Sequence, residues 1–259
     1  MGTPLKDWDI NIYRGILTGY NEAFIIDGAT KERLIKEDPK SAEIIRPILR
    51  GRDIKRYGYE FADLWLINTH NGVREKGIKP IDVKDYPAIK RHLDQYWDKI
   101  EPRADQGITP YNLRNCVYIE DFSKPKILWA ETMRIHKGDT INFPRFGFEE
   151  DGKYVTDKTC FFATGKDLKY INAVLNSAVG RYLLSQYVSI LDDGGYLMQK
   201  IYLELIPIAP YSPKLETVVA NSIIANAELA IDEIVYQLYG LSEEEVSFIE
   251  TVRNQPLQR

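Results

Sequence analysis

Cysteine is scarce in this chain of 259 residues, which has only Cys116 and Cys160. Two cysteines are too few for a disulfide scaffold, and they lack the paired spacing of a zinc site. We therefore expect two reduced thiols in the core. No apolar run reaches the roughly 18 residues that a membrane span needs, and the start MGTPLKDWD lacks the basic and apolar regions of a signal peptide. These absences predict a cytoplasmic protein that does not enter a membrane.

Common catalytic signatures are missing as well. The sequence contains no G-x-G-x-x-G, Walker loop, G-x-S-x-G or H-E-x-x-H, and its three histidines have no ligand-like spacing. We therefore predict no catalytic, metal-binding or cofactor-binding residue in this chain. A metal-dependent nuclease needs two carboxylates and a lysine around one cation. Asp151-Gly152-Lys153, and Glu120-Asp121 with Lys124, supply such pieces, so an endonuclease stays open as an alternative.

Basic charge is in deficit over the whole chain, which has 34 Lys and Arg, 38 Asp and Glu and a formal net charge of −4. The deficit is concentrated at the end: from Glu204 onward there are three basic and nine acidic residues. Residues 1–203 hold 31 basic and 29 acidic residues, and Lys31 to Tyr57 alone holds nine basic and five acidic ones. The net charge argues weakly against a nucleic-acid partner, but the body of the chain can form a locally positive surface.

The composition, with 44% hydrophobic and 28% charged residues, is that of a globular protein. Hydrophobic periodicity and turn signals predict a strand, a tight turn and a second strand over Ile10–Asp27, and a strand over Asp63–Asn68. Further strands are expected over 116–120, 126–131, 158–164 and 196–208, with a turn at 149–152. Helices are predicted from Thr30 to Asp38, over 86–97, and over 168–187 with Thr164 and Asp167 as a capping pattern.

The end of the sequence predicts one long amphipathic helix over 215–238 that stops at Gly240, followed by a capping box from Ser242 to Glu245. We expect its apolar stripe to pack along the back of the preceding domain, or to dock a partner protein. The predicted fold class is mixed α/β (α+β): a twisted, mainly antiparallel sheet with flanking helices. The predicted division is residues 1–210 as one domain and residues 211–259 as a helical segment packed on it.

Turn-rich loops between the apolar strands carry Arg, Lys, Asn, Gln and Tyr. Arg and Lys can donate to guanine, and Asn and Gln can pair with adenine, so these residue types are suited to reading DNA. From composition alone, ordinary solvated loops are the better interpretation. The candidate DNA-binding residues are Arg74, Lys76, Lys79, Arg103, Asn112, Arg114, Asn115, Arg134, Lys137, Lys153, Tyr154, Gln199 and Lys200.

Several segments resemble one known family and follow one another in the same order as in that family. They favour DNA binding over the interpretation as ordinary solvated loops. The matching segments are Gly15–Asp27, Ile45–Tyr57, Trp65–Ile67, Arg103–Gly107, Tyr111–Cys116, Phe122–Ile127, Ala173–Ser177, Ile206–Ile208 and Ile231–Leu241. Together they resemble the Taq-like C-terminal specificity domain of adenine-specific DNA methyltransferases and type IIG restriction-modification enzymes. The similarity spans nearly the whole chain.

The resemblance implies a target recognition domain that holds double-stranded DNA and presents an adenine to a methyltransferase domain of the same polypeptide, which flips the base out. That other domain would supply the S-adenosylmethionine site and an N-P-P-Y-type motif, which this sequence lacks. The full-length protein would be an adenine-N6 methyltransferase, with or without a magnesium-dependent endonuclease activity.

The segments that resemble the family contain residues that stabilise the fold and residues that could contact DNA. Arg50, Arg52, Lys55 and Arg56 could face phosphates, but Asp53 is placed to pair with an arginine and fix a local turn, and we favour this brace. Because the shared motifs should mainly be scaffold, we expect base reading from the loops between them, at Arg74, Lys76, Lys79, Arg134, Lys137, Lys153, Tyr154, Gln199 and Lys200. For the Arg103–Asn115 loop we expect phosphate clamping.

Overall fold

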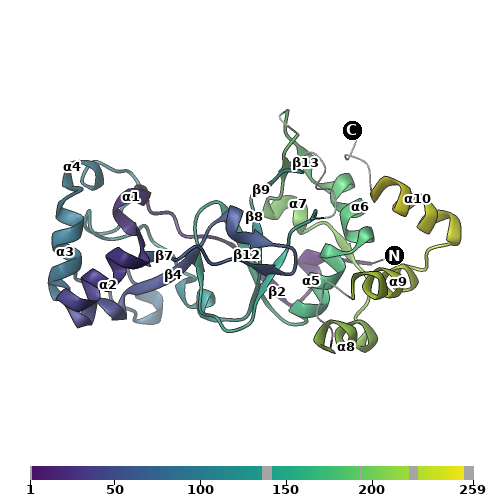
Figure 1. The fold of residues 1–259 in the computed structure, drawn as a ribbon, viewed down its shortest axis with the longest axis horizontal. Helices are drawn as coiled ribbons and strands as arrows, with labels where there is room; N and C mark the ends of the chain where they lie inside the picture. The colour runs from purple at the N-terminus through teal and green to yellow at the C-terminus, as the bar shows by residue number, and fades with distance from the viewer. Residues whose placement is uncertain (1, 136–141, 193, 222–226, 254–259) are drawn as a thin grey trace.

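The computed structural model describes residues 2–135, 142–192, 194–221 and 227–253. The molecule is elongated, with helices gathered at both ends and strands between them (Figure 1). The helices at one end are α1 (Asn21–Phe24), α2 (Gly28–Glu37), α3 (Pro87–Asp94) and α4 (Trp97–Ile100). Those at the other end are α5 (Leu168–Asn176), α6 (Ala178–Tyr187), α7 (Lys200–Leu203), α8 (Pro213–Asn221), α9 (Glu228–Tyr239) and α10 (Glu243–Arg253). Short 3₁₀ helices are η1 (Leu5–Asp7), η2 (Pro39–Glu43), η3 (Gly51–Asp53), η4 (Arg74–Lys76), η5 (Val83–Asp85) and η6 (Ile119–Ser123).

An antiparallel sheet forms the wall between two hydrophobic cores. Its strand order is β10 (Gly147–Glu149), β8 (Lys126–Ala130), β12 (Cys160–Gly165) and β2 (Ile10–Arg14). Side chains alternate between the faces of a strand. Paired Trp129 and Phe161 therefore join the core on the α5 side, while paired Leu128 and Phe162 join the core on the α1–α3 side.

The second four-stranded sheet belongs to the smaller end, where α1, α2 and α3 pack around it. Its order is β11 (Val155–Thr156), β4 (Ile45–Leu49), β7 (Leu64–Ile67) and β3 (Ile25–Asp27), antiparallel except for the pair β11–β4. The remaining pairings are β1 (Thr3–Pro4) with β15 (Pro207–Ile208), β5 (Ile54–Lys55) with β6 (Gly58–Tyr59), and β14 (Tyr196–Leu197) between β13 (Ser189–Ile190) and β9 (Thr132–Met133). Mostly antiparallel sheets with flanking helices confirm the predicted α+β class.

The C-terminal helices pack on α5 and α6. Asp232 of α9 is 2% exposed and accepts a hydrogen bond from the Ala178 amide, 2.8 Å away, at the start of α6. The Tyr239 hydroxyl donates to the Pro207 carbonyl at 2.6 Å. Ile231 and Val235 are fully buried in the larger core, so this part of the predicted apolar stripe packs against the body of the chain.

Several predicted elements are present in a different form. The helix expected over 215–238 is found as α8 and α9, with residues 222–226 outside the described part of the chain. The helix expected over 168–187 is divided at Ser177, whose hydroxyl accepts from the Gly180 amide at 3.0 Å and caps α6. The predicted capping pattern of Thr164 with Asp167 is wrong, because Thr164 lies within β12 and Asp167, which precedes α5 with φ 53°, makes no side-chain cap.

Long-range strand pairing explains two further corrections. The hairpin predicted over Ile10–Asp27 is wrong, because β2 pairs with β12 and β3 pairs with β7 in a different sheet. The strand predicted over 116–120 is replaced by the turn that leads into η6. In contrast, α2 ends before Pro39, Gly240 terminates α9 with φ 63°, and Ser242 and Glu245 form both bonds of the capping box, all as predicted. No helix among the described residues combines the length and apolarity of a membrane span.

Candidate nucleic-acid interface

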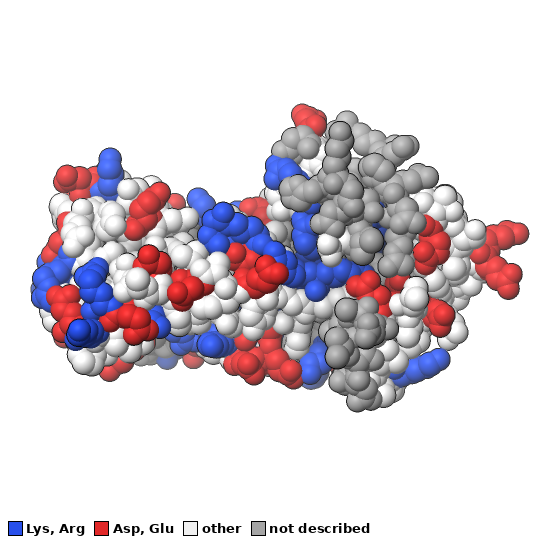
Figure 2. Space-filling model, viewed as in Figure 1, with Lys and Arg blue, Asp and Glu red and all other residues white. Residues whose placement is uncertain are grey.

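A hollow of about 840 Å³ lies beside the central sheet, where η3 and β5 face the ends of β8 and β9. We call it the basic cleft. Its cations are Arg52, Lys55, Arg56, Arg134 and Arg145, and its carboxylates are Glu60 and Glu131. Figure 2 shows lysine and arginine gathered over the middle of the molecule, where its outline narrows between the two ends. The excess of cations gives the cleft a positive potential that favours an anionic partner.

The turn η3 is held in shape by an ion pair and presents Arg52 to the cleft. Asp53 is 5% exposed and accepts from the Arg50 amide at 2.8 Å and from the Arg50 Nε at 2.9 Å. This hydrogen-bonded ion pair raises the pKa of Arg50. It confirms the prediction that Asp53 pairs with an arginine and fixes a local turn, and it identifies that arginine as Arg50. Arg52, at the middle of the turn, is exposed; its carbonyl accepts from Lys55 Nζ at 3.3 Å, and its guanidinium forms no hydrogen bond or ion pair with any described residue.

Two further cations of the cleft already have acidic partners. Arg56 has a side chain that is 8% exposed, and its Nε lies 2.7 Å from Glu228 Oε1 at the start of α9. Lys55 Nζ lies 3.3 Å from Glu60 Oε2, but the Lys55 side chain is 44% exposed. Arg56 therefore ties the cleft to the C-terminal helices, whereas Lys55 and Arg52 can turn toward a ligand in the cleft.

Glu131 connects the basic cleft to a second hollow of about 460 Å³. Its two carboxylate oxygens lie 2.6 Å from Arg14 Nη2 and 3.3 Å from Gln199 Nε2. Arg14 Nε also donates to the Lys158 carbonyl at 3.1 Å. The second hollow is lined by Arg14, Gly15, Ile16, Leu17, Arg114, Asn115, Cys116, Tyr118 and Lys158.

Two loops, 70–80 and 103–117, continue this polar surface. Hollows of about 560 Å³ and 580 Å³ lie along them and share Asn71, Ile108 and Asn115, and the first also shares Arg114 with the hollow next to Arg14. Shared lining residues make the hollows adjoin. We call the surface that runs from the basic cleft past Arg14 to these loops the polar strip. Its members beyond the cleft are Arg14, Asn71, Arg74, Lys79, Gln106, Arg114, Asn115 and Lys158.

A buried arginine fixes the shape of the loop 103–115. Arg103 is 7% exposed, and its guanidinium donates to the carbonyls of Asp105 at 2.8 Å, Pro110 at 3.0 Å and Asn112 at 2.5 Å, and to that of Thr18. Burial lowers the pKa of Arg103 to about 10, so the side chain keeps its charge at neutral pH. Four main-chain acceptors occupy this guanidinium, so in this conformation Arg103 stabilises the loop and is not available to a DNA phosphate.

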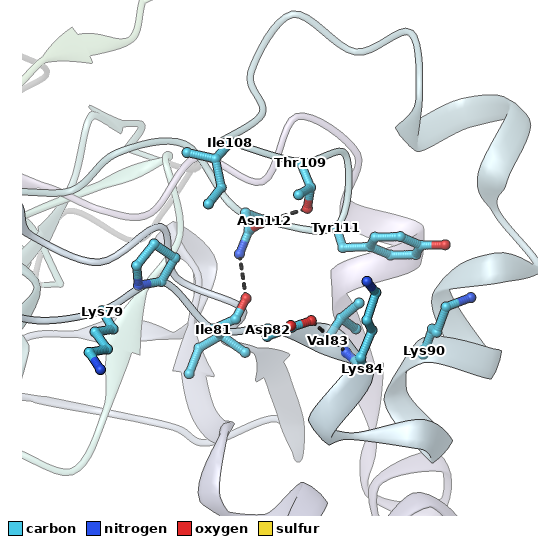
Figure 3. A pocket seen from close by; sticks show the side chains of 11 residues that line it. Lys79, Ile81, Asp82, Val83, Lys84, Lys90, Ile108, Thr109, Tyr111 and Asn112 are labelled. Atoms are coloured by element: carbon cyan, nitrogen blue, oxygen red, sulfur yellow. Dashed lines mark hydrogen bonds between the residues drawn. The ribbon is translucent and has the colours of Figure 1, made fainter.

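Asn112 joins the same loop to the segment that precedes α3 (Figure 3). It is 2% exposed, its Nδ2 donates to the Ile81 carbonyl at 2.9 Å, and its Oδ1 accepts from the Thr109 hydroxyl at 2.6 Å. The adjacent hollow of about 460 Å³ has aliphatic walls, with Lys79, Lys84 and Lys90 among its lining residues. Asn112 is therefore part of the scaffold in this conformation.

The other predicted residues do not all lie on this surface. Arg74, Lys79, Arg114 and Asn115 lie on the polar strip, Arg134 lines the basic cleft, and Gln199 contacts it through Glu131. Lys76 and Lys200 are paired with Glu120 at 2.7 Å and Glu204 at 3.5 Å. Tyr154 is 8% exposed and packs against Tyr59 and Phe61, with Lys153 over its ring, so its side chain is not accessible to a duplex here. Lys137 lies outside the described residues.

Sequence reasoning did not select Arg14, Asn71, Gln106, Arg145 and Lys158, which the structure brings to the same surface. Arg14 ends β2 and Lys158 comes shortly before β12, so antiparallel pairing of these strands places them together. A basic residue at a strand end, next to Gly15, was the available signal for Arg14.

Two of the carboxylates considered for nuclease chemistry, Glu120 and Asp121, are paired with lysines. Asp121 Oδ1 lies 2.6 Å from Lys124 Nζ, and Glu120 Oε2 lies 2.7 Å from Lys76 Nζ. Across the described ranges, no group of three or more His, Cys, Asp or Glu side chains is arranged to hold a metal ion.

Comparison with known proteins places the chain beside DNA-modifying enzymes, although no family model matches it. It is 25% identical over 246 residues to the type II methyltransferase M.XhoI of Xanthomonas vasicola, covering 92% of this chain and 41% of that protein. It is 27% identical over 242 residues to the type II methyltransferase M.PaeR7I of Pseudomonas aeruginosa, covering 90% of this chain and 38% of that protein. The chain thus spans about two fifths of the length of these relatives.

Solved structures of restriction-modification enzymes contain the same fold. The type IIL restriction-modification enzyme MmeI, solved in complex with DNA, matches with a TM-score of 0.68 at 13% identity, covering 98% of this chain and 36% of MmeI. The type IIG restriction endonuclease BpuSI matches with a TM-score of 0.55 at 13% identity, covering 97% of this chain and 30% of BpuSI. In both cases nearly all of this chain corresponds to about a third of a larger protein.

Proposed function

We propose that this chain is the DNA target recognition domain of a type II restriction-modification protein, as the resemblance to the Taq-like specificity domain implies. The observation that carries the proposal is the polar strip: adjoining hollows lined by arginine, lysine and carboxamide side chains on a chain whose net charge is −4. Cations bind the phosphate backbone, and carboxamides and arginine read base edges. The similarity to methyltransferases along 92% of the chain supports the same conclusion.

We propose a division of labour in which this chain binds and reads duplex DNA while the rest of the polypeptide methylates adenine. S-adenosylmethionine carries a sulfonium and an ammonium cation, and the lining of the basic cleft, with Arg52, Lys55 and Arg134, does not fit a cationic cofactor. Residues 211–259 are proposed to act as a helical segment packed on the recognition domain, with its acidic side chains held away from the DNA by charge repulsion.

The proposal is tested by enrichment from a pool of duplexes with a randomised central segment. The protein is incubated with the pool at low salt, bound duplexes are recovered and amplified, and the affinity for the enriched sequence is measured by fluorescence anisotropy. We expect a defined sequence motif and an affinity at least about tenfold higher than for an unrelated duplex, since specific sites exceed non-specific ones by several kcal/mol. Absence of binding at low salt would overturn the proposal, and so would binding without sequence preference.

The same purified protein distinguishes the endonuclease alternative. Incubation with supercoiled plasmid and magnesium is expected to leave the plasmid intact, because the carboxylates near η6 are paired with lysines. Cleavage that disappears in Asp121→Asn would instead favour a nuclease.

A further inference from the structure

We propose that the loop 103–115 reads an A·T base pair, with Ile108 against the methyl group at C5 of thymine and the carboxamide of Asn115 on the adenine. The inference rests on the proposed function and deepens it. It names two specificity-determining positions, Ile108 and Asn115, of which only Asn115 was among the residues predicted from the sequence.

Ile108 is an aliphatic side chain held in solvent. It is 69% exposed, and Val117, which lines the same hollow, is 61% exposed. Exposing a single large aliphatic side chain is common in proteins, but two that share one hollow amid cations and carboxamides form an apolar spot within a polar surface. Such a spot matches an apolar group displayed by an otherwise polar ligand.

Hydrogen bonds to neighbouring segments hold the loop that carries Ile108 in this structure. The Ile108 amide donates to Asn71 Oδ1 at 2.7 Å, and the Gly107 amide donates to the Asn112 carbonyl at 3.0 Å. Arg103 also donates to the carbonyls of Pro110 and Asn112, and the Asn112 side chain donates to the Ile81 carbonyl. A side chain at position 107 would collide with the Asn71 carboxamide, so glycine is required at this close approach. Preorganisation lowers the entropy lost when Ile108 meets a ligand.

The neighbours of Ile108 are the residue types that recognise adenine and phosphate. Ile108 lines three hollows, which it shares with Asn71, Lys79, Gln106, Arg114 and Asn115. Asn115 is exposed, and its Oδ1 accepts from Asn71 Nδ2, which orients the carboxamide. Its Nδ2 forms no hydrogen bond with the described residues, so it can donate to N7 of adenine while Oδ1 retains a second lone pair for N6.

Thymine is the partner of adenine and displays a methyl group in the major groove. An apolar side chain beside a carboxamide therefore recognises both members of one base pair, adenine through hydrogen bonds and thymine through its methyl group. A methyl group at C5 also occurs in 5-methylcytosine, and the test has to separate the two bases.

The experiment uses the enriched duplex and replaces each thymine in turn by uracil, which removes only the methyl group. Burying one such group is worth about 0.8 kcal/mol, so the affinity of the wild-type protein is expected to fall about fourfold at one thymine. The variant Ile108→Ala is expected to bind the thymine and uracil duplexes equally. Leu229→Ala is the matched control, because Leu229 is 74% exposed on α9, away from the loop, and it should retain the fourfold preference.

The outcomes separate this inference from the function on which it rests. Failure to enrich any sequence contradicts the proposed function itself. Enrichment of a motif followed by equal binding of every uracil duplex overturns only the assignment of Ile108, as does a thymine preference that persists in Ile108→Ala. Tighter binding of a duplex with 5-methylcytosine, without any loss at uracil, would overturn the assignment to thymine. Circular dichroism of Ile108→Ala checks that the variant is folded.

Discussion

At the residue scale, burial separates the cations that stabilise the fold from those that remain accessible. Lys126 and Glu149 form an ion pair in which both side chains are completely buried, between strands β8 and β10. Lys126 Nζ also donates to the Phe122 carbonyl at 2.8 Å, and Glu149 Oε1 accepts from the Lys153 amide at 3.0 Å. Arg52, in contrast, is exposed in the basic cleft. The same residue types therefore serve two purposes, and only their environment distinguishes them.

The buried pair gives a stability prediction. Lys126→Met leaves the Glu149 carboxylate buried without a counter-charge, which should lower the free energy of unfolding by about 3–5 kcal/mol. Urea denaturation measures this loss. Lys166→Met is the control, because Lys166 Nζ lies 2.7 Å from Asp9 Oδ2 and the two side chains are 76% and 68% exposed, so loss of this surface pair should leave stability almost unchanged. Equal effects of the two substitutions would contradict the structural importance of the buried pair.

Two histidines, the buried His92 and the half-buried His70, are expected to make stability depend on pH. Burial lowers the pKa of His92 and of His70 below the ordinary value of 6.5. As the pH falls below 6.5, the unfolded chain gains protons that the folded chain does not, so stability is lost until the pH reaches the lowered pKa values. The urea midpoint should therefore be lower at pH 5.5 than at pH 7.5.

The variant His92→Gln isolates this contribution. His92 is 5% exposed, and Nε2 lies 3.0 Å from the Ala23 carbonyl, a contact that glutamine can preserve by donating its amide. The variant should lose less stability than the wild type between pH 7.5 and 5.5. Burial raises the pKa of Asp157, which has the opposite effect at lower pH, so the difference between variant and wild type is the relevant quantity. Identical pH profiles would exclude His92 as a source of the dependence.

At the element scale, loops of this protein are positioned by side chains that are distant in sequence. Asn71 bridges the two loops of the polar strip, since its Oδ1 accepts from the Ile108 amide at 2.7 Å and its Nδ2 donates to Asn115. The loop 103–115 also depends on Arg103, which reaches the Thr18 carbonyl before α1. Loops anchored in this way have fewer conformations to lose on binding, which in the proposed DNA complex favours sequence discrimination over adaptable binding.

Removing the Asn71 bridge tests this role. Asn71→Ala should lower stability by only about 1 kcal/mol, because the bonds lie at the surface. It should also broaden the sequence motif that the protein enriches from randomised duplexes, since Ile108 and Asn115 lose their common support. Asn11→Ala, at an exposed asparagine of β2, should leave the motif unchanged. A variant that enriches the same motif with the same stringency as the wild type would contradict the bridge.

Local signals in the sequence were sufficient to predict some elements. Asp38-Pro39 ends α2, Gly240 ends α9, and Ser242 with Glu245 begins α10, because capping and proline geometry act within a few residues. The partners of β2 and β3 could not be predicted, because strand pairing joins residues far apart in the chain. Arg103 lies in a turn-rich, polar stretch of the sequence, where arginine is usually exposed to solvent. Only the folded chain shows that its side chain is buried.

At the scale of the whole molecule, positive charge gathers in the middle and acidic side chains accumulate on the C-terminal helices. From Glu204 onward nine acidic residues stand against three basic ones, whereas the basic cleft has Arg52, Lys55, Arg56, Arg134 and Arg145 against Glu60 and Glu131. A duplex that follows the polar strip would meet the cations and avoid the acidic helices α9 and α10. The distribution of charge thus supports the proposed binding of a polyanion by a protein whose net charge is −4.

Salt dependence is the expected consequence. The affinity for the enriched duplex should fall steeply between 50 and 200 mM salt, by roughly tenfold or more, because phosphate contacts release counterions. The double variant Arg52→Ala/Lys55→Ala should bind all duplexes about 3- to 10-fold more weakly, with a shallower salt slope and an unchanged motif. Lys214→Ala, an exposed lysine of α8, serves as the control. An unchanged slope in the double variant would show that the basic cleft does not contact phosphates.

Hydrogen–deuterium exchange of the protein with and without its enriched duplex tests the polar strip most directly. The account predicts slower exchange on DNA binding in residues 51–56, 71–79, 105–117 and 131–134, with no change in α9 and α10. Protection confined to the C-terminal helices, or to the face of α2 and α3 remote from these loops, would contradict it.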